Sequence, residues 1–269
     1  MIIQTKTRKA HYYNEDRIFI GENYFMVMDG ATPLLKSGIK PTEASWFVSY
    51  IKKNLPKNCQ NVVEKLNNIS INAVETLKSY NFEINEKYMP STGLAWIELK
   101  NDYIVAHTIG DCEVTARLKN GQIVRVYQTE LLKLDNIAVK ELVKQAKVNN
   151  ICVKQARKYI QDILIKHRSY MNKENGYNVF TPSPNPNFKF SKKQFKICDV
   201  EEMYIYTDGL SQAFDELKIY NDHKEMFKTS LDLNKEIEKI VKTAFSDKDC
   251  NTFPRFKTID DIAVIKITF

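Results

Sequence analysis

The apolar segments of this sequence come mainly in pairs, and a short polar turn separates the members of each pair. The pairs are 17–20 with 24–28, 94–99 with 103–108, and 113–118 with 122–127. The turn of the third pair contains Asn120-Gly121, which is the strongest short hairpin signal between β-rich segments. Because so short a turn joins only antiparallel strands, the chain is constrained to antiparallel sheets.

Helix-forming segments stand in blocks between these hairpins. The helices expected are 44–55, 61–80, 129–171 and 233–245. Thr42 predicts the N-cap of the first helix, and Pro56 predicts its end. Further single strands are expected at 1–8, 195–197, 203–206 and 262–269. Hairpins with helices in blocks favour an α+β layered fold over a doubly wound parallel sheet.

Composition places the chain among globular proteins. It is 43% hydrophobic and 27% charged, with no low-complexity tract, so residues 1–269 are expected to form a single domain. The longest apolar runs are about as long as residues 24–28, which is too short to cross a bilayer. Met1–Arg8 lacks the apolar core of a signal peptide. The five cysteines have no close pairs and no zinc spacing, which predicts reduced thiols in a cytoplasm.

The net charge of +7 is concentrated in one segment. Residues 129–173, called here the basic segment, contain ten Lys or Arg and four Asp or Glu, a difference of +6. The rest of the chain is nearly neutral, so a general nucleic-acid footprint is not expected. We interpret the basic segment as a helical embellishment of the domain. Its charges indicate either a solvated helix face or a flap that docks an acidic partner beside a cleft.

Acidic residues stand at the ends of several predicted strands. They are Glu15-Asp16, Asp29-Gly30, Gly110-Asp111, Asp208-Gly209 and Asp260-Asp261. A single Asp-Gly is usually a turn, but five acidic sites at strand ends repel one another unless a cation binds them. Carboxylates without His or Cys partners favour hard cations such as Mg²⁺ or Mn²⁺. The cluster therefore predicts a two-metal site.

These acids belong to an ordered series of short motifs. The series is Asn14-Glu15-Asp16, Val27-Met28-Asp29-Gly30, Ser91-Thr92-Gly93, Ile109-Gly110-Asp111, Tyr206-Thr207-Asp208-Gly209 and Asp260-Asp261-Ile262-Ala263-Val264. From about residue 3 to residue 269 it resembles the type 2C metal-dependent serine/threonine phosphatases, and Gly176-Tyr177 before a Pro-rich loop is similar to bacterial members. The resemblance implies a four-layer α/β/β/α sandwich of two antiparallel sheets flanked by helices, with metals in a cleft at one end.

The resemblance also implies a role for each matched position. Asp29 would bridge two Mg²⁺ or Mn²⁺ ions, the Gly30 carbonyl would bind one of them, and Asp208 with Asp260 would hold the other. Glu15 and Asp16 would act through water, and Asp111 would belong to a weaker third-metal site or would simply cap a turn. A water shared by the two ions would lose its proton near neutral pH and attack the phosphorus of phosphoserine or phosphothreonine.

A cysteine-based mechanism does not fit the sequence. It would need a thiolate with an arginine six positions later in a phosphate-cradling loop, whereas Arg117 follows Cys112 by five positions inside a hairpin. The expected partner is a phosphoprotein substrate, without nucleic acid or membrane.

The chain departs from the family pattern at three positions. His11 stands where many members have a phosphate-binding arginine; it is either a catalytic phosphate contact, with Arg8 or Lys9 as substitutes, or an ordinary strand residue. Ala31 stands where relatives carry His or Met, so it offers no proton to a leaving group. Gln212 replaces an acid expected at the third-metal site, which makes that ion doubtful, with Asp215 as a displaced substitute.

These departures keep open a catalytically weak or inactive pseudophosphatase that acts as a binding module. The basic segment keeps open a metal nuclease that uses the same carboxylates.

The adjacent acids Asp260 and Asp261 are expected to differ in direction. Asp260 is expected to face the site and Asp261 to face solvent.

Overall fold

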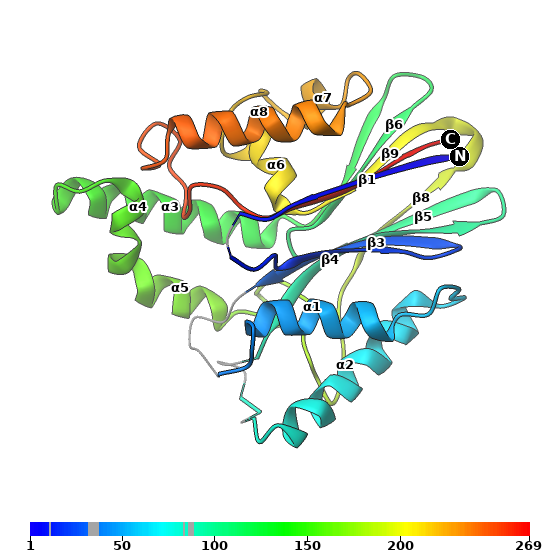
Figure 1. Cartoon of the computed structure of the whole chain (residues 1–269), viewed down its shortest axis with the longest axis horizontal. Coiled ribbons are helices and arrows are strands. Elements are labelled where there is room, and N and C mark those ends of the chain that lie inside the picture. Colours follow the sequence, from blue (N-terminus) through cyan, green and yellow to red (C-terminus); the bar gives the residue numbers. More distant parts are fainter. Residues whose placement is uncertain (11, 32–37, 83, 86–88) are drawn as a thin grey trace.

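The computed structural model of this protein describes residues 1–10, 12–31, 38–82, 84–85 and 89–269. Two five-stranded antiparallel sheets lie face to face, with helices outside both (Figure 1). The strands are β1 (Ile2–Arg8), β2 (Asp16–Ile20), β3 (Tyr24–Ala31), β4 (Ser91–Lys100), β5 (Tyr103–Ile109), β6 (Glu113–Leu118), β7 (Ile123–Val126), β8 (Ser191–Lys196), β9 (Val200–Tyr206) and β10 (Ile262–Thr268). The predicted α+β sandwich of two antiparallel sheets is confirmed.

Each hairpin predicted from the sequence forms part of a sheet. The first sheet has the order β1-β10-β9-β6-β7, and the second has the order β2-β3-β4-β5-β8. β10, the last strand in the sequence, therefore lies between β1 and β9, and the two chain ends lie side by side.

Alternation along β3 explains why residues 24–28 form a continuous apolar run. Phe25 and Val27 point between the two sheets, where they pack with residues such as Ile205 and Ile265 of the opposite sheet. Met26 and Met28 point the other way, onto the helices. A strand that is buried on both faces loses the polar alternation of a half-exposed strand, because successive side chains point to opposite faces.

Helices cover the outer face of each sheet. The helices are α1 (Glu43–Asn54), α2 (Val62–Ser79), α3 (Glu130–Val148), α4 (Val153–Ala156), α5 (Gln161–Arg168), α6 (Asp208–Asp215), α7 (His223–Met226) and α8 (Leu233–Ser246), with 3₁₀ turns η1 (Arg157–Ile160) and η2 (Ile197–Asp199). α1 and α2 pack on the second sheet, and α6 to α8 pack on the first. The side chain of Thr42 accepts a hydrogen bond from the Ser45 amide at 3.0 Å, which confirms the predicted N-cap.

The basic segment differs from the continuous helix that was expected over 129–171. Asn149-Asn150 ends α3, with Asn150 in the left-handed region (φ 49°), and the chain then turns into α4, η1 and α5. These elements pack around a small core of their own that includes Leu142, Ile160 and Cys250. Arg168 at the end of α5 donates to the Met89 carbonyl at 3.0 Å, so the segment is fastened to both sides of the sandwich.

Two predicted strands are displaced from their expected ranges. The strand expected at 195–197 is β8, which ends at Lys196, and Ile197 begins the turn η2. The strand expected at 203–206 begins earlier, at Val200. Along the described residues, no helix combines the length and apolar character needed to cross a membrane.

A buried histidine gives the fold a distinct pH dependence. His107 of β5 stacks on Trp96 with ring centroids 4.6 Å apart, and its Nε2 lies 3.4 Å from a Glu98 carboxylate oxygen. Burial lowers the pKa of His107 to about 4, although Glu98 opposes this shift. An unfolded chain protonates histidine near pH 6.5 and therefore binds more protons between pH 6.5 and 4. This residue thus lowers the free energy of unfolding as the pH falls through that window.

We predict that His107→Gln reduces the loss of stability between pH 6.5 and 4.5. The measurement is urea unfolding of the wild type and the variant at both pH values, followed by Trp fluorescence. Groups remote from position 107 titrate alike in both proteins, so the difference between the two pH slopes reports on His107 together with its partner Glu98. Equal slopes would contradict the prediction.

Candidate metal centre

Four aspartates from both sheets meet at one end of the sandwich. Asp16 of β2 lies directly opposite Asp29 of β3 in the sheet register. Asp208 follows β9 and begins α6, and Asp260 precedes β10. The opposite sheets are joined here by the Thr207 hydroxyl, which donates to Asp16 Oδ2 at 2.6 Å and accepts from the Ala263 amide at 2.9 Å.

Mutual repulsion defines the electrostatics of this cluster. Burial raises the pKa of Asp29 well above its ordinary value, and the charges of Asp16, Asp208, Asp111 and Asp260 raise it further. The pKa of Asp208 and that of Asp16 are raised for the same reasons, burial first and neighbouring carboxylates second. Asp208 Oδ1 is buried and has no hydrogen-bond partner among the described residues. An orphaned carboxylate oxygen among buried acids is the environment that a divalent cation stabilises, so the residues present fit hard metal ions.

Asp111 can approach the cluster because the neighbouring residue, Gly93, has no side chain. Gly93 of β4 lies opposite Asp29, and a Cβ at position 93 would stand 2.5 Å from Asp111 Oδ1 and 3.1 Å from Cys112 Sγ. Ligand atoms of Asp29, Asp111 and Cys112 all lie within 4.8 Å of one another. Burial raises the pKa of the Cys112 thiol well above its usual value, so this residue is no thiolate nucleophile. Its place beside the carboxylates was not anticipated from the sequence.

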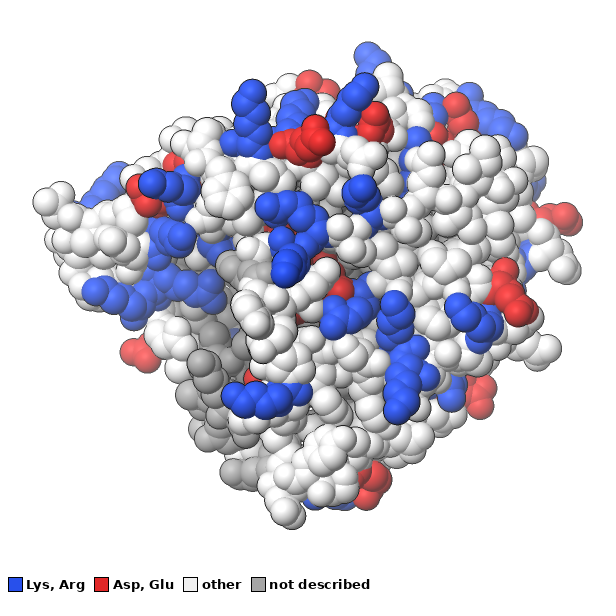
Figure 2. Space-filling view, viewed as in Figure 1, with Lys and Arg blue, Asp and Glu red and all other residues white. Residues whose placement is uncertain are grey.

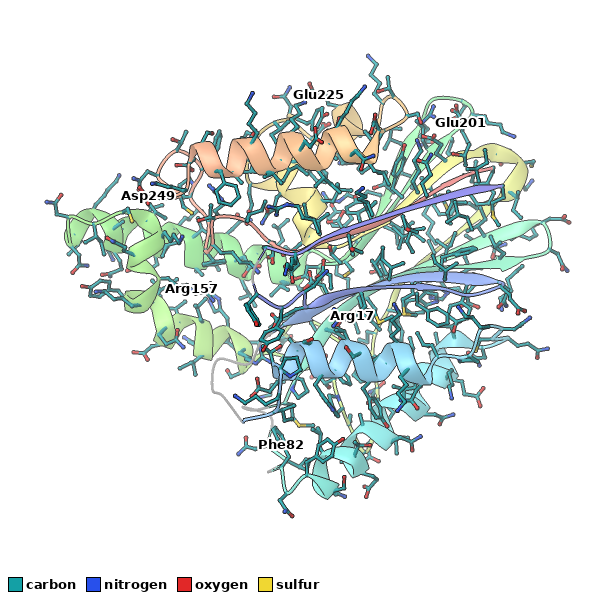
Figure 3. All side chains as sticks on the ribbon, viewed as in Figure 1. Arg17, Phe82, Arg157, Glu201, Glu225 and Asp249 are labelled. Atoms are coloured by element: carbon teal, nitrogen blue, oxygen red, sulfur yellow. The ribbon has the colours of Figure 1, made fainter. Side chains whose placement is uncertain are left out.

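Glu15 and Gly30 lie next to the cluster. The Gly30 amide donates to the Glu15 carbonyl at 3.1 Å, and Glu15 Oε1 accepts from the Thr42 hydroxyl at 2.6 Å. Arg17 holds this corner by donating to the Asn14 carbonyl and to two serine hydroxyls of α1 (Figure 3). The start of β2 is therefore fixed against α1.

The expectation that Asp261 faces solvent is wrong. Asp261 is only 5% exposed, and its two oxygens accept from the backbone amides of Ala10 and Glu15 at 2.6 and 2.5 Å. Both members of the pair 260–261 are thus buried, because one faces the cluster and the other fixes the loop before β2. The sequence showed two adjacent acids but not the unpaired amides that the second one satisfies.

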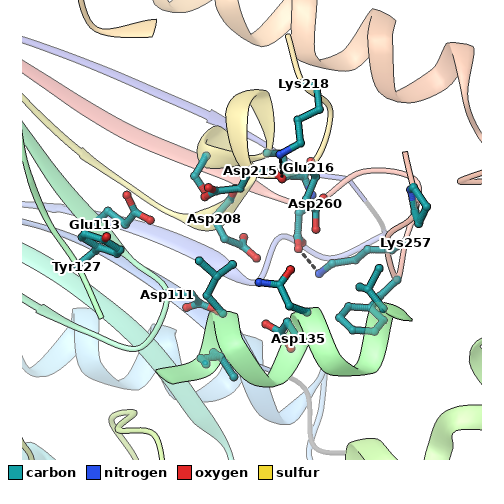
Figure 4. Close-up of a pocket in the computed structure, with 18 of the residues that line it drawn as sticks. Asp111, Glu113, Tyr127, Asp135, Asp208, Asp215, Glu216, Lys218, Lys257 and Asp260 are labelled. Atoms are coloured by element: carbon teal, nitrogen blue, oxygen red, sulfur yellow. Dashed lines mark hydrogen bonds and ion pairs between the residues drawn. The ribbon is translucent and has the colours of Figure 1, made fainter. Parts of the chain in front are cut away.

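A cavity of about 660 Å³ opens beside the cluster (Figure 4). Its lining includes Asp111, Asp208 and Asp260, together with Asp135 of α3 and Glu216 after α6. The basic segment therefore borders the cleft. Burial raises the pKa of Asp135 and that of Glu216 to about 7 each. Neither acid was anticipated, since they follow no apolar strand.

Gln212 and Asp215 occupy different environments in this cavity. Gln212 is 3% exposed, and its buried Oε1 has no hydrogen-bond partner in the described part of the chain. Asp215 Oδ2 accepts from Arg125 at 3.1 Å, so the displaced substitute considered for the third-metal site is already engaged by an arginine. Glu216 Oε2, by contrast, is buried, and no described residue forms a hydrogen bond with it.

The cation expected near position 11 is only partly accounted for. His11 lies outside the described residues. Arg8 ends β1 opposite Ile262, and neither Arg8 nor Lys9 is among the described residues that line the cavity. Ala31 is exposed at the end of β3. A lysine that the sequence reading did not single out, Lys257, is in the lining instead.

Comparison with known proteins agrees with this fold. The family model described as protein phosphatase 2C matches residues 4–245. No curated protein sequence matches the chain. The serine/threonine phosphatase Stp1 from Staphylococcus aureus superposes with a TM-score of 0.57 at 13% identity, over 99% of this chain and 94% of that one.

Two further solved structures share the fold. PppA from Pseudomonas aeruginosa has a TM-score of 0.56 at 11% identity, covering 100% of this chain and 97% of its own. The catalytic domain of the serine/threonine protein phosphatase PstP, solved with two manganese ions, has a TM-score of 0.52 at 12% identity, covering 98% and 96%. The chain belongs to the protein phosphatase 2C family. It is thereby a protein serine/threonine phosphatase by class, and its fold supports phosphatase activity with metal ions.

We predict that Gly93→Ala weakens Mn²⁺ binding by displacing Asp111. The added methyl group would lie 2.5 Å from Asp111 Oδ1, so this carboxylate would have to move away from its place in the cluster. Titration calorimetry measures the affinity. The control is Gly121→Ala in the β6–β7 turn, which strains a backbone at φ 83° by about 1–2 kcal/mol but places the new methyl group more than 4 Å from the atoms of the described residues. Equal Mn²⁺ affinity in the Gly93 variant and the wild type would refute this role of the glycine.

We also predict that Asp208→Asn stabilises the metal-free protein and removes its response to Mn²⁺. One charge fewer relieves the repulsion among buried acids, while a ligand that binds only the folded state adds about 2.7 kcal/mol at 100 times its Kd. Thermal unfolding in EDTA and in Mn²⁺ measures both effects. Asp215→Asn, in the same helix but paired with Arg125, is expected to keep the Mn²⁺ response. A full Mn²⁺ response in the Asp208 variant would contradict the assignment.

Proposed function

We propose that this protein hydrolyses phosphoserine and phosphothreonine in proteins with two Mg²⁺ or Mn²⁺ ions held by the aspartate cluster. The observation that carries the proposal is the convergence of Asp16, Asp29, Asp208 and Asp260 from both sheets around an unpartnered buried oxygen of Asp208. Purely oxygen ligands of this kind favour hard divalent ions. When bound, such ions supply an activated water and stabilise charge on the phosphoryl oxygens.

Each residue of the cluster has a proposed role in binding the ions or in positioning the site. Asp29 and the Gly30 carbonyl would hold one ion, and Asp29 with Asp208 and Asp260 would hold the other. Asp16 positions the site, because its Oδ2 accepts a hydrogen bond from the Thr207 hydroxyl, which links the two sheets. Glu15 and Asp16 would orient water around the cluster, and Asp111 would hold a weaker third ion.

The basic segment is proposed as an embellishment of a single phosphatase-like domain over residues 1–269. It borders the cleft through Asp135, Lys140 and Arg157. The face shown in Figure 2 carries Lys and Arg side chains from several elements with acids between them. A phosphoprotein that enters the cleft would therefore meet cations on the segment, which is the role proposed for it in docking. A cytoplasmic location follows from the cysteine usage and stays part of the proposal.

Removal of the central ligand tests the proposal. The purified wild type is expected to hydrolyse a phosphothreonine peptide in Mn²⁺, and EDTA or Asp29→Asn is expected to lower kcat at least about a hundredfold, the scale of losing a central electrostatic stabiliser. Malachite green detection of released phosphate gives the rate, and circular dichroism confirms that the variant is folded. Activity that survives both EDTA and the substitution would rule the function out.

A pseudophosphatase that only binds partners is the second candidate. Gln212 in place of an acid and Ala31 in place of His or Met favour it. Calorimetry separates the two, because a folded wild type that binds no Mn²⁺ supports the pseudophosphatase.

A further inference from the structure

One lysine points into the acidic cluster from the loop between α8 and β10. Lys257 Nζ forms an ion pair with Asp260 Oδ2 (Figure 4). Burial lowers the pKa of Lys257, but the charges of Asp260, Asp208 and Asp29 raise it above its usual range, so the ammonium interacts with proposed metal ligands from both sheets. The Lys257 side chain is 42% exposed, so a molecule in the cavity can reach it.

The loop that carries Lys257 is held in place by a buried arginine. Arg255 is 0% exposed and donates to Asp247 Oδ2 at 2.8 Å and to the carbonyls of Ala244, Asp247, Phe253 and Thr258 at 2.6–3.1 Å. Asp247 also accepts the backbone amides of residues 251 to 253 at 2.9–3.0 Å. A loop with so many satisfied groups presents the lysine at a defined position.

Three other cations in the described cavity lining have partners of their own, and a fourth, Lys140, is exposed on α3. Arg125 pairs with Glu113 and Asp215, and it stacks over the Tyr127 ring at 4.2 Å. Lys218 Nζ donates to the carbonyls of Phe214 and Asp215 at 3.1 and 2.7 Å. Arg157 on the basic segment donates to the Phe256 carbonyl at 3.5 Å (Figure 3). Lys257 is the cation that the described structure pairs with a proposed metal ligand.

A lysine is a poor permanent counter-ion for this cluster. Two divalent ions on the carboxylates would repel a neighbouring ammonium, so Lys257 opposes metal binding unless an anion also enters. A phosphoryl group is such an anion, because its oxygens carry up to two negative charges and accept hydrogen bonds from ammonium groups. The sequence offers histidine, not arginine, at position 11, where relatives are expected to hold phosphate.

We propose that Lys257 is the residue that binds the substrate phosphoryl group, by donating from Nζ to a phosphoryl oxygen once Asp260 is engaged by metal. The proposal rests on the proposed function for the identity of the substrate. The proposal predicts opposite effects of Lys257 on the affinities for the two ligands. Lys257 strengthens the binding of phosphate and weakens the binding of Mn²⁺, whereas a merely structural residue would support both.

The test compares Lys257→Ala, Lys257→Arg and the control Lys52→Ala, an exposed lysine of α1 that lies outside the described cavity lining. Calorimetry measures Mn²⁺ affinity and then the affinity of the Mn²⁺-loaded protein for inorganic phosphate, and steady-state kinetics gives kcat and KM on a phosphothreonine peptide. Lys257→Ala is expected to weaken phosphate binding and raise KM about tenfold, the scale of one charged hydrogen bond, and to tighten Mn²⁺ binding. Lys257→Arg is expected to retain most phosphate affinity, and Lys52→Ala all of it.

The outcomes separate this proposal from the proposed function. Unchanged phosphate affinity in Lys257→Ala, or Mn²⁺ and phosphate affinities that fall together, would overturn the role of Lys257 even in an active enzyme. Phosphate binding that depends on Lys257 in a protein without hydrolytic activity would support the lysine and reject the phosphatase. A wild type that binds no phosphate in Mn²⁺ would also overturn the role of Lys257.

Discussion

Repulsion among buried carboxylates is the constraint on which this structure depends. Asp16 and Asp260 are 2% and 8% exposed. Burial and the charges of neighbouring carboxylates raise the pKa values of Asp16, Asp29 and Asp208. A protein gains nothing in stability from such a cluster, because each charge is costly to bury without a partner. Hydrogen bonds of the surrounding residues therefore hold the acids together. The Thr207 hydroxyl links the two sheets, and Asp261 accepts hydrogen bonds from the loop before β2. Arg17 connects the start of β2 to α1.

The sequence predicted the fold well where local chemistry decides it. Asn120-Gly121 lies at the predicted turn, Thr42 caps α1, and the run 24–28 is β3, since each depends on neighbours along the chain. The acids at strand ends could also be identified from the sequence, because an apolar strand pattern followed by Asp-Gly marks where a strand ends. The positions that meet across β2 and β3, such as Asp16 and Asp29, follow from the hairpin register.

What the sequence could not supply comes from tertiary contacts. Asp261 is buried because two distant amides need acceptors, and no pattern near residue 261 indicates them. Asp135 and Glu216 reach the cavity from helical segments, and Lys257 reaches it from a loop fixed by Arg255. The break after α3 depends on Asn149-Asn150, whose helix-ending effect is weaker than that of glycine or proline.

The order of strands in the first sheet bears on how the protein is made. β10 lies between β1 and β9, and Asp260 stands at its entrance, although both come after every other element in the chain. A ribosome-bound chain whose residues beyond about 258 are still in the exit tunnel lacks the strand that joins β1 to the sheet. The acidic centre is therefore assembled only after synthesis of its last ligand, and β1 stays unpaired until β10, the strand to which it hydrogen-bonds, has been made.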